Sequence, residues 1–322
     1  MNSEGDPILI VGGPTASGKS ALALDLALRL RGVVINADSM QVYKELRILS
    51  ARPTLADEER VPHRLYGTLP ARKRCSAGQW CSMALAEIAD AQRKQLLPIL
   101  VGGTGLYFRS LLKGLAPVPP VPQGIRDAAA GLHSEVGAVE FHRLLAIRDP
   151  DGAARIHPAN TQRVLRAYEV FEATGKGLGI WQNEQAAGAG YAGKVAALVL
   201  EPSREVLYAA CDTRSEFMAA AGGVEEVAAL LTLELDPALP IMKALGVREF
   251  AAFLGGDETR DKAVKNLRRA TRRYAKRQAT WFRHQMVGTK RVSARYNGAQ
   301  EQNIMEIAVA LLSETTSSQR PK

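Results

Sequence analysis

A glycine-rich segment near the start of the chain constrains the fold more than any other feature. Residues 13–20 read GPTASGKS, after an apolar, β-branched run at 7–11 and before a helix-forming stretch at 20–30. In a strand–loop–helix context, backbone N–H groups of such a loop surround phosphate oxygens, the lysine neutralises phosphate charge and the serine can ligate Mg²⁺. The motif predicts a phosphate site with Ser20 as metal ligand, but it does not say what the phosphate is attached to. The predicted site consists of Gly13, Pro14, Thr15, Ala16, Ser17, Gly18, Lys19 and Ser20.

Three further apolar runs favour β-strands, at residues 33–35, 98–101 and 196–200. Helix-forming stretches alternate with these runs, which is typical of a parallel sheet covered by helices. We therefore expect an α/β fold, with a P-loop NTPase-like parallel sheet flanked by helices. Binding sites in such folds lie at the carboxyl ends of the strands.

A proline-rich segment and a change of pattern predict a second domain. Four prolines lie within residues 117–122, and only helical patterns follow over 124–190. In the clearest helix, 161–173, apolar residues recur at helical spacing; Asn160 can cap its start and Gly175 can end it. The predicted division is a core domain of residues 1–122 and 191–322 with a helical insertion domain of residues 123–190.

Acidic residues are scarce where a nucleotide-hydrolysing P-loop protein would place its metal-binding aspartate. The strand at 98–101 ends in Gly-Gly-Thr, and the strand at 196–200 is followed by Glu201, a poor substitute. The best acid within reach is Asp38, shortly after the strand at 33–35. Asp38 could be a general base, a metal partner, or a helix cap or turn former, and the spacing does not decide among these roles.

Two more side chains follow predicted strands and are candidates for substrate contacts. Thr104 lies in a Gly-Gly-Thr-Gly turn, where glycines allow a backbone to approach a ligand closely. The alternative for this turn is an ordinary strand-to-helix connection. Arg214 lies on a helix after the strand at 196–200, where it could clamp a phosphate or simply solvate the surface.

The most strongly charged segment is residues 265–285, KNLRRATRRYAKRQATWFRHQ. Solvated helix faces usually mix charges because like charges four residues apart repel, yet no acidic residue occurs here. The segment favours contacts with nucleic-acid phosphates, as does the net charge of +9; a merely solubilising face is the alternative. On a helical wheel, Val264, Leu267, Tyr274 and Trp281 form the apolar face, and the basic face holds Arg268, Arg269, Arg272, Arg273, Lys276 and Arg277.

Composition narrows the class of protein further. No apolar run reaches the ~20 residues of a membrane span, and the first residues do not resemble a cleavable apolar leader. The three cysteines, Cys75, Cys81 and Cys211, form no CxxC pair, and their odd number argues against a disulfide framework. We therefore expect a cytoplasmic protein without a membrane partner.

Six stretches taken together resemble the tRNA dimethylallyltransferases, also called tRNA isopentenylpyrophosphate transferases. In order, they are GPTASGKS, INADSMQVY, PILVGGTGLYF, RIHPANTQRVLRA, DTRSEFM and RRYAKRQATWFR. The likeness extends from Pro7 to Phe282, and several of these stretches are not shared with other P-loop proteins. The sequence departs from the family pattern at some positions. After the second strand the family commonly has Gly-Thr-Ala-Lys-Pro, whereas residues 50–53 here read SARP.

The resemblance implies transfer of a dimethylallyl group from dimethylallyl diphosphate to N6 of the adenosine 3′ of the anticodon in tRNA. Diphosphate is released, and Mg²⁺ is the implied cofactor. The P-loop and Lys19 would hold the diphosphate, with Arg214 as a further clamp. Asp38 would accept the N6 proton, and Thr104 would orient both substrates. The missing metal-binding aspartate fits this reaction, because no γ-phosphoryl group is transferred.

The resemblance also implies where tRNA is bound. The matching positions are Asp38, Ser39, Met40, Gln41, Thr104, Arg126, Gln162, Arg163, Val164, Leu165, Arg166, Lys243, Ala244, Leu245, Gly246, Val247 and Arg248. The basic helix adds Arg272 and Arg277 as predicted tRNA contacts. We expect the enzyme to act as a monomer.

Three other functions compete with this interpretation. They are an isopentenyltransferase acting on a free adenine nucleotide, a P-loop kinase of a small metabolite, and a nucleic-acid-binding protein with a vestigial P-loop. The basic helix and the insertion argue against the first two, because a small substrate would not use them. The intact Lys19-Ser20 pair argues against the third.

Overall fold

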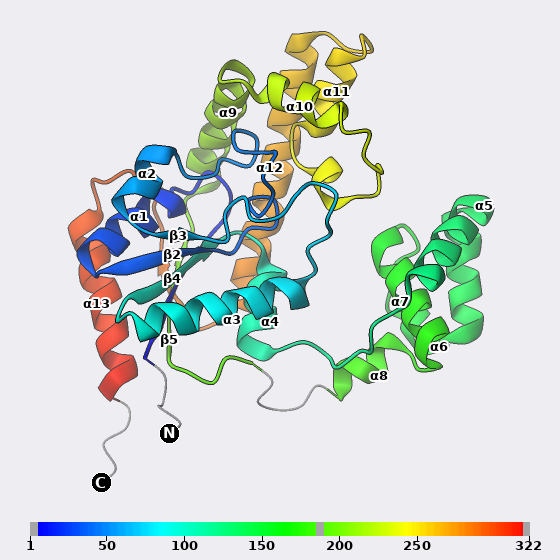
Figure 1. Cartoon of the computed structure of the whole chain (residues 1–322), viewed down its shortest axis with the longest axis horizontal. Helices are drawn as coiled ribbons and strands as arrows, with labels where there is room; N and C mark the ends of the chain where they lie inside the picture. Colours follow the sequence, from blue (N-terminus) through cyan, green and yellow to red (C-terminus); the bar gives the residue numbers. More distant parts are fainter. Residues whose placement is uncertain (1–5, 185–189, 318–322) are drawn as a thin grey trace. The chain divides into compact units, whose positions relative to one another are not determined.

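The computed structural model of the chain describes residues 6–184 and 190–317 (Figure 1). Its contacts form two compact units, one of residues 1–111 with 192–322 and one of residues 112–191. We call these the core unit and the insertion unit. The first boundary falls before the proline-rich segment instead of after it, so that segment belongs to the insertion unit.

The core unit is built on a sheet of six strands among the described residues, and all of its strand pairings are parallel. The strand order β3-β2-β4-β1-β5-β6 confirms the expected parallel α/β architecture. The strands are β1 (Ile8–Gly12), β2 (Gly32–Asn36), β3 (His63–Arg64), β4 (Leu97–Gly102), β5 (Val195–Leu200) and β6 (Lys290–Val292). The short edge strands β3 and β6 were not expected, because two or three mostly polar residues give no apolar pattern.

Helices cover both faces of this sheet (Figure 1). Alternate strand residues point to opposite faces, so Leu9 and Val11 pack with α1 and α13, whereas Gly12 faces Phe282 of α12. Strand β1 is completely buried, as expected for a central parallel strand. The helices of the core unit are α1 (Lys19–Arg29), α2 (Leu55–Arg60), α3 (Ala77–Arg93), α4 (Gly105–Lys113), α9 (Arg204–Ala220), α10 (Gly223–Leu231), η1 (Pro240–Lys243), α11 (Val247–Leu254), α12 (Arg260–Gln285) and α13 (Glu301–Ser317).

The insertion unit has a helical core of its own. Phe141 and Leu145 pack with Val164 and Tyr168, and these side chains are almost fully buried. The Asn160 side chain accepts a hydrogen bond from a backbone N–H at the start of α7, and Gly175 ends this helix with φ 67°, so both predicted signals are confirmed. The helices are α5 (Gln123–Arg148), α6 (Pro150–Ala154), α7 (Thr161–Thr174) and α8 (Leu178–Asn183).

The basic segment forms α12, but its buried face is not the one that the wheel predicted. The buried residues are Ala263, Leu267, Thr271, Ala275, Gln278 and Phe282, whereas Val264, Tyr274 and Trp281 are only half-buried. The prediction weighted large apolar side chains and overlooked small and polar ones. Close packing favours small residues where helices approach each other, and Gln278 finds polar partners.

Two of the compositional expectations can be compared with the fold. Cys75, Cys81 and Cys211 are all free thiols, with Cys211 buried and the other two half-buried. Within the described residues, no helix combines the length and the apolar character that crossing a bilayer requires.

Candidate active site

The phosphate loop joins β1 to α1 at the carboxyl edge of the sheet. Its backbone is left-handed at Gly13 (φ 152°), Ala16 (φ 65°) and Gly18 (φ 91°). Such turns let successive N–H groups converge on one anion. A Cβ at Gly18 would lie 2.2 Å from the carbonyl oxygen of Tyr296, and the Tyr296 N–H donates to the Ser17 carbonyl at 3.0 Å. The segment before α13 therefore holds the loop in place from outside the sheet.

Helix α12 holds the phosphate loop through Gln278, a residue with no predicted role. Gln278 Oε1 accepts from the Thr15 N–H at 2.7 Å, and its Nε2 donates to the Gly103 carbonyl at 2.9 Å. This buried side chain fixes the phosphate loop relative to the turn that carries Thr104. The Thr15 amide is consequently engaged by protein. An uncharged glutamine within RRYAKRQATWFR was the only signal in the sequence.

Two cations lie beside the phosphate loop. The Lys19 ammonium is 3.4 Å from the Pro14 carbonyl oxygen, and Arg214 Nη2 donates to the Ser50 carbonyl at 3.4 Å. Burial lowers the pKa of Lys19 to about 8 and lowers the pKa of Arg214, while the nearby charge of Asp38 acts in the opposite direction on both. Half-buried cations that lack a full anionic partner favour an anionic ligand between them.

A cavity of about 760 Å³ lies between the phosphate loop, the first turn of α1 and one side of α9. Its polar lining is Lys19, Ser20, Thr213, Arg214 and Arg295, and its apolar lining includes Val206, Ala209, Ala210 and Phe217. Cations and hydroxyl groups beside apolar side chains suit an organic phosphate. The structure thus brings together the predicted Lys19, Ser20 and Arg214.

Asp38 lies in a turn directly after β2. Its N–H donates to Asn36 Oδ1 at 2.8 Å, and its Oδ1 accepts from the Met40 N–H at 2.9 Å. This is a side-chain-stabilised turn, and no helix begins there, so the helix-cap alternative is wrong. Asp38 does not line the cavity itself, but its charge acts on the pKa values of Lys19 and Arg214. Its charge therefore lies close enough to act on both cations, from the carboxyl end of β2, which β4 separates from β1.

Thr104 follows β4 and adjoins the turn that carries Asp38. Its Oγ1 accepts from the Ser39 N–H at 2.9 Å and donates to Ser39 Oγ at 3.3 Å. A Cβ at Gly102 would lie 2.1 Å from the Ala37 carbonyl oxygen, so the two turns approach each other as closely as backbones can. Thr104 is thus locked to the residue next to Asp38.

Tyrosine hydroxyls near Asp38 form a part of the site that the sequence did not indicate. Burial raises the pKa values of Tyr66, Tyr107 and Tyr274, and the Asp38 charge adds to the effect. A second negative charge beside a carboxylate is unfavourable, so these hydroxyls remain protonated donors. Tyr107 is fixed by stacking on Trp80, with ring centroids 4.4 Å apart.

The metal prediction rests on Ser20 alone. No group of three or more His, Cys, Asp or Glu side chains capable of holding a metal occurs in the described parts of the chain. Glu201, the weak candidate after β5, instead accepts hydrogen bonds from Arg283 at 2.6 Å and Arg291 at 2.8 Å. Any metal bound here would take most of its ligands from a bound phosphate compound and water.

The residues predicted to contact tRNA fall into buried and exposed groups. Gln41 Nε2 donates to the Ser50 and Ala51 carbonyls, so this side chain serves the fold. Arg166 pairs with Glu169 at 3.7 Å. The side chains of Val164, Ala244 and Val247 are buried, Ser39, Met40, Arg126, Leu165 and Leu245 are half-buried, and Gln162, Arg163, Lys243 and Arg248 are exposed. The exposed residues can contact a polyanion through their side chains, whereas the buried residues could contact it only through backbone groups.

Helix α9 neutralises part of the basic helix. Arg268 pairs with Glu216, and Arg272 pairs with both carboxylate oxygens of Asp212, with Nε 2.7 Å from Oδ1. The acids lie far earlier in the chain, so the sequence segment alone concealed them. Arg269, Arg273 and Lys276 are exposed, and no acidic partner for them occurs within the described residues, while Arg277 lies 5.6 Å from the Tyr274 ring centroid.

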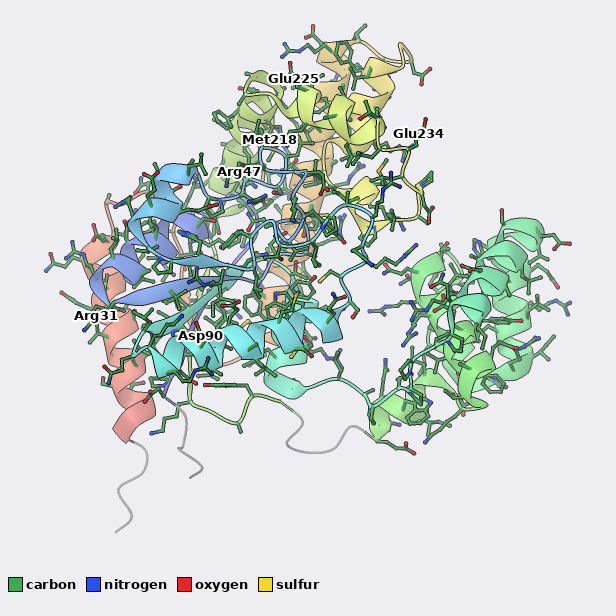
Figure 2. The ribbon with its side chains drawn as sticks, in the orientation of Figure 1. Arg31, Arg47, Asp90, Met218, Glu225 and Glu234 are labelled. Carbon is green, nitrogen blue, oxygen red and sulfur yellow. The ribbon has the colours of Figure 1, made fainter. Side chains whose placement is uncertain are left out.

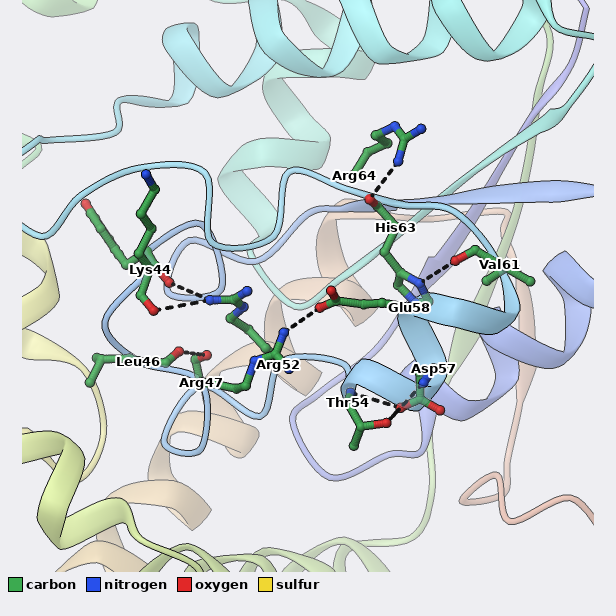
Figure 3. A network of polar contacts seen from close by, with 12 residues as sticks. Lys44, Leu46, Arg47, Arg52, Thr54, Asp57, Glu58, Val61, His63 and Arg64 are labelled. Atoms are coloured by element: carbon green, nitrogen blue, oxygen red, sulfur yellow. Dashed lines mark hydrogen bonds and ion pairs between the residues drawn. The ribbon is translucent and has the colours of Figure 1, made fainter.

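Polar contacts also fix the segment between β2 and β3 (Figure 3). Arg52 Nη1 donates to the carbonyls of Tyr43 and Lys44, at 3.3 Å each. Arg47 pairs with Glu58 at 2.7 Å. Arg52 stands in the SARP stretch that departs from the common family pattern, and here its guanidinium closes the loop on itself.

Comparison with known proteins agrees with this geometry. The family model described as IPP transferase matches residues 41–285, and one described as Isopentenyl transferase matches residues 7–73. A tRNA dimethylallyltransferase of Rhodospirillum centenum is 55% identical over 285 residues, which are 88% of this chain and 91% of that protein. One from Paramagnetospirillum magneticum is 49% identical over 289 residues, or 90% of this chain and 91% of that protein.

Solved structures agree as well. A full-length tRNA isopentenylpyrophosphate transferase from Bacillus halodurans has a TM-score of 0.70 at 29% identity, covering 97% of this chain and 98% of that one. A eukaryotic dimethylallyltransferase acting on tRNA has a TM-score of 0.83 at 25% identity, covering 98% of this chain and 81% of that one. By sequence over most of its length and by fold, the chain belongs to the IPP transferase family.

Proposed function

We propose that this protein transfers a dimethylallyl group from dimethylallyl diphosphate to N6 of an adenosine in tRNA, 3′ of the anticodon. The observation that carries the proposal is the convergence of Lys19 and Arg214 on one cavity, with the charge of Asp38 close enough to act on the pKa values of both. The relatives named tRNA dimethylallyltransferase support the reaction and the tRNA substrate. The resemblance, not the geometry, supports the choice of adenosine.

The diphosphate lies against the phosphate loop in this scheme. Backbone N–H groups, Lys19 and Arg214 oppose the negative charge that grows on the leaving diphosphate as the bond from carbon C1 to oxygen breaks. Electrostatic stabilisation of this kind is usually the largest single contribution to catalysis. Because the Thr15 amide is engaged by Gln278, the remaining loop amides and the two cations do this work.

The residues present fit Mg²⁺ bound together with the diphosphate. Ser20 lines the cavity in the first turn of α1, and a hydroxyl oxygen is a suitable ligand for this hard cation. With no acidic cluster in the described residues, the diphosphate oxygens would complete the coordination. Bound Mg²⁺ would supply further neutralisation of the leaving group.

Asp38 accepts the proton that N6 loses as its lone pair forms the new bond to C1. Both products are then accounted for, the alkylated adenosine and free diphosphate. Asp38 Oδ2 makes no hydrogen bond in the described part of the chain, so it can receive this proton. General-base catalysis of this type contributes roughly 10²–10⁴-fold to the rate. Thr104, bonded to Ser39, orients the substrates from the adjacent strand end.

The adenosine must leave its stack in the tRNA loop before N6 can be reached, which costs a few kcal/mol. Contacts with the tRNA backbone offset this cost. The exposed cations of α12 and the exposed Lys243 and Arg248 are the groups available for it in the core unit, and Gln162 and Arg163 in the insertion unit. All of these groups come from one chain, so we propose that a monomer suffices.

One assay separates this function from its competitors. Purified protein is incubated with radiolabelled dimethylallyl diphosphate, Mg²⁺ and either unmodified tRNA, AMP or ATP, and the label is followed. We expect transfer to tRNA alone. Transfer to AMP but not tRNA would identify a free-nucleotide transferase, and ATP consumption with a phosphorylated metabolite would identify a kinase.

The Asp38→Asn variant tests the base. It keeps an oxygen for the Met40 N–H but has a far weaker proton acceptor, so we expect turnover to fall by roughly 10²-fold or more while tRNA affinity stays nearly constant. Normal single-turnover chemistry with weakened tRNA binding would remove Asp38 from this role.

A further inference from the structure

A carboxylate outside the cavity holds a loop that contributes one residue, Ala51, to the cavity lining. The loop comprises residues 46–51, between β2 and α2, and we call it the 46–51 loop. The N–H groups of Arg47 and Ile48 donate to Glu226 Oε1 at 2.8 and 2.7 Å, and the Leu49 N–H donates to Oε2 at 3.0 Å. Glu226 lies in α10, next to Glu225, which Figure 2 labels together with Arg47. Three consecutive N–H groups are thus gathered by one charged acceptor, a strong type of hydrogen bond.

Packing fixes the same loop in a second way. Leu49 is buried, and its side chain lies against the backbone of two glycines. A Cβ at Gly223 would lie 3.0 Å from Leu49 Cδ2, and one at Gly246 would lie 2.8 Å from it. Leu49 therefore fills the space between the start of α10 and the turn before α11, which leaves the loop little room to shift.

The next two residues connect this loop with the cavity. The Ser50 carbonyl accepts from Arg214 Nη2 at 3.4 Å and from Gln41 Nε2 at 2.9 Å. Ala51 lines the cavity and has a left-handed backbone with φ 50°, an unfavourable conformation for alanine. A strained residue keeps such a conformation only while its surroundings enforce it, and the bonds to Glu226 are two to four residues away.

We infer that Glu226 is a positioning residue of the active site. It sets the place of the Ser50 carbonyl, and through it the place of the Arg214 guanidinium at the diphosphate. It touches neither substrate. The inference rests on the proposed function for the identity of the ligand, but the geometry that connects Glu226 with Arg214 does not depend on it.

Glu226→Ala and Glu226→Gln test this role in the full-length protein, with Glu225→Gln as the control. Glu225 is the exposed neighbour on α10, and it accepts no bond from the 46–51 loop. In Glu226→Gln the amide oxygen can keep the N–H groups of Arg47 and Ile48, but the NH₂ group then faces the Leu49 N–H, donor against donor.

The measurements are the dissociation constant of inorganic pyrophosphate with Mg²⁺, by calorimetry, and the dissociation constant of tRNA. We expect pyrophosphate binding to weaken about tenfold in Glu226→Ala, the factor produced by about 1.4 kcal/mol. The loss in Glu226→Gln should be smaller but measurable, while Glu225→Gln binds as the wild type does. Affinity for tRNA should stay within about twofold in all variants, which corresponds to about 0.4 kcal/mol or less.

Steady-state kinetics give a readout that a purely structural role would not move. The KM for dimethylallyl diphosphate should rise while the KM for tRNA does not. If Glu226→Ala does not fold, Glu226→Gln decides on the same readouts. Folded variants that bind pyrophosphate as tightly as the wild type would overturn the inference. Should the wild-type protein itself bind no pyrophosphate, the proposed function fails first and the inference with it.

Discussion

Replacing Gln278 by leucine removes a side chain that joins the phosphate loop to the Thr104 turn. Leucine is similar in size, so the main effect is electrostatic. The Thr15 N–H and the Gly103 carbonyl, bonded to Gln278 at 2.7 and 2.9 Å, both lose their partner in a buried place. Each unsatisfied buried group costs about 1–3 kcal/mol, so the core unit should lose about 2–6 kcal/mol of unfolding free energy.

Thermal unfolding followed by circular dichroism measures this loss. At roughly 2–4 °C per kcal/mol for a unit of this size, the expected fall in Tm is about 4–24 °C. The matched control is Gln285→Leu, the same change at an exposed position of the same helix, for which we expect almost no shift. If Gln278→Leu melted within a degree or so of the wild type, the bonds would not have the stabilising role assigned here.

The Gln278→Glu variant tests the same two hydrogen bonds in a second way. A carboxylate can still accept from Thr15, but its other oxygen faces the Gly103 carbonyl unless it carries a proton. The folded state should therefore raise the pKa of this glutamate above its unfolded value. Stability should be greatest at acid pH, below the unfolded pKa, and should be lost as the pH rises through the folded pKa. A variant equally stable at pH values on both sides of these pKa values would contradict the reasoning.

Three further predictions concern charge and packing. Since the pKa of Lys19 is lowered to about 8, and a bound diphosphate favours the ammonium form, affinity for dimethylallyl diphosphate should fall as pH rises above 8, whereas Lys19→Arg should show no such fall. Neutralising Arg269, Arg273 and Lys276 together should flatten the salt dependence of tRNA binding by roughly 0.7–0.9 in log–log slope per lost phosphate contact, measured by filter binding. Removing the two arginines already paired with α9 should flatten it less. Phe141→Ala should destabilise the insertion unit by about 3–5 kcal/mol, seen as faster hydrogen exchange in α5 and α7 but not in β1.

The sequence predicted the parts of the site whose signals are local. The phosphate loop lies within eight consecutive residues, and the strands that present Asp38 and Thr104 are apolar runs with clear ends. Parallel strands meet at one edge of a sheet, so their carboxyl ends could be placed together without coordinates. The helix signals at Asn160 and Gly175 were confirmed for the same reason, because capping depends on neighbouring residues.

Hydrogen bonds between residues far apart in the chain could not be predicted from the sequence. Gln278 contacts Thr15 across 263 positions, and Glu226 contacts the 46–51 loop across 177–179 positions. The pattern of apolar and polar residues does not indicate which buried side chain will hydrogen-bond to which backbone group. Strand β3 was missed because its pairing comes from its place beside β2, not from its two residues. The buried face of α12 was misjudged because small residues, not large ones, mark a close approach between helices.

The pairing of α12 with α9 changes what the basic helix is for. Arg272 holds Asp212, and two residues further along α9 lies Arg214, which faces the diphosphate cavity. Moving α9 along its axis would move Arg214 by the same amount, so this ion pair fixes a cation of the site. The buried face of α12 meanwhile carries Gln278, which fixes the phosphate loop. Helix α12 thus helps to position the phosphate loop and Arg214, while its exposed cations can meet a polyanion. A helix selected only to bind RNA would not need acidic partners on its neighbour, and a helix selected only for packing would not carry unpaired arginines.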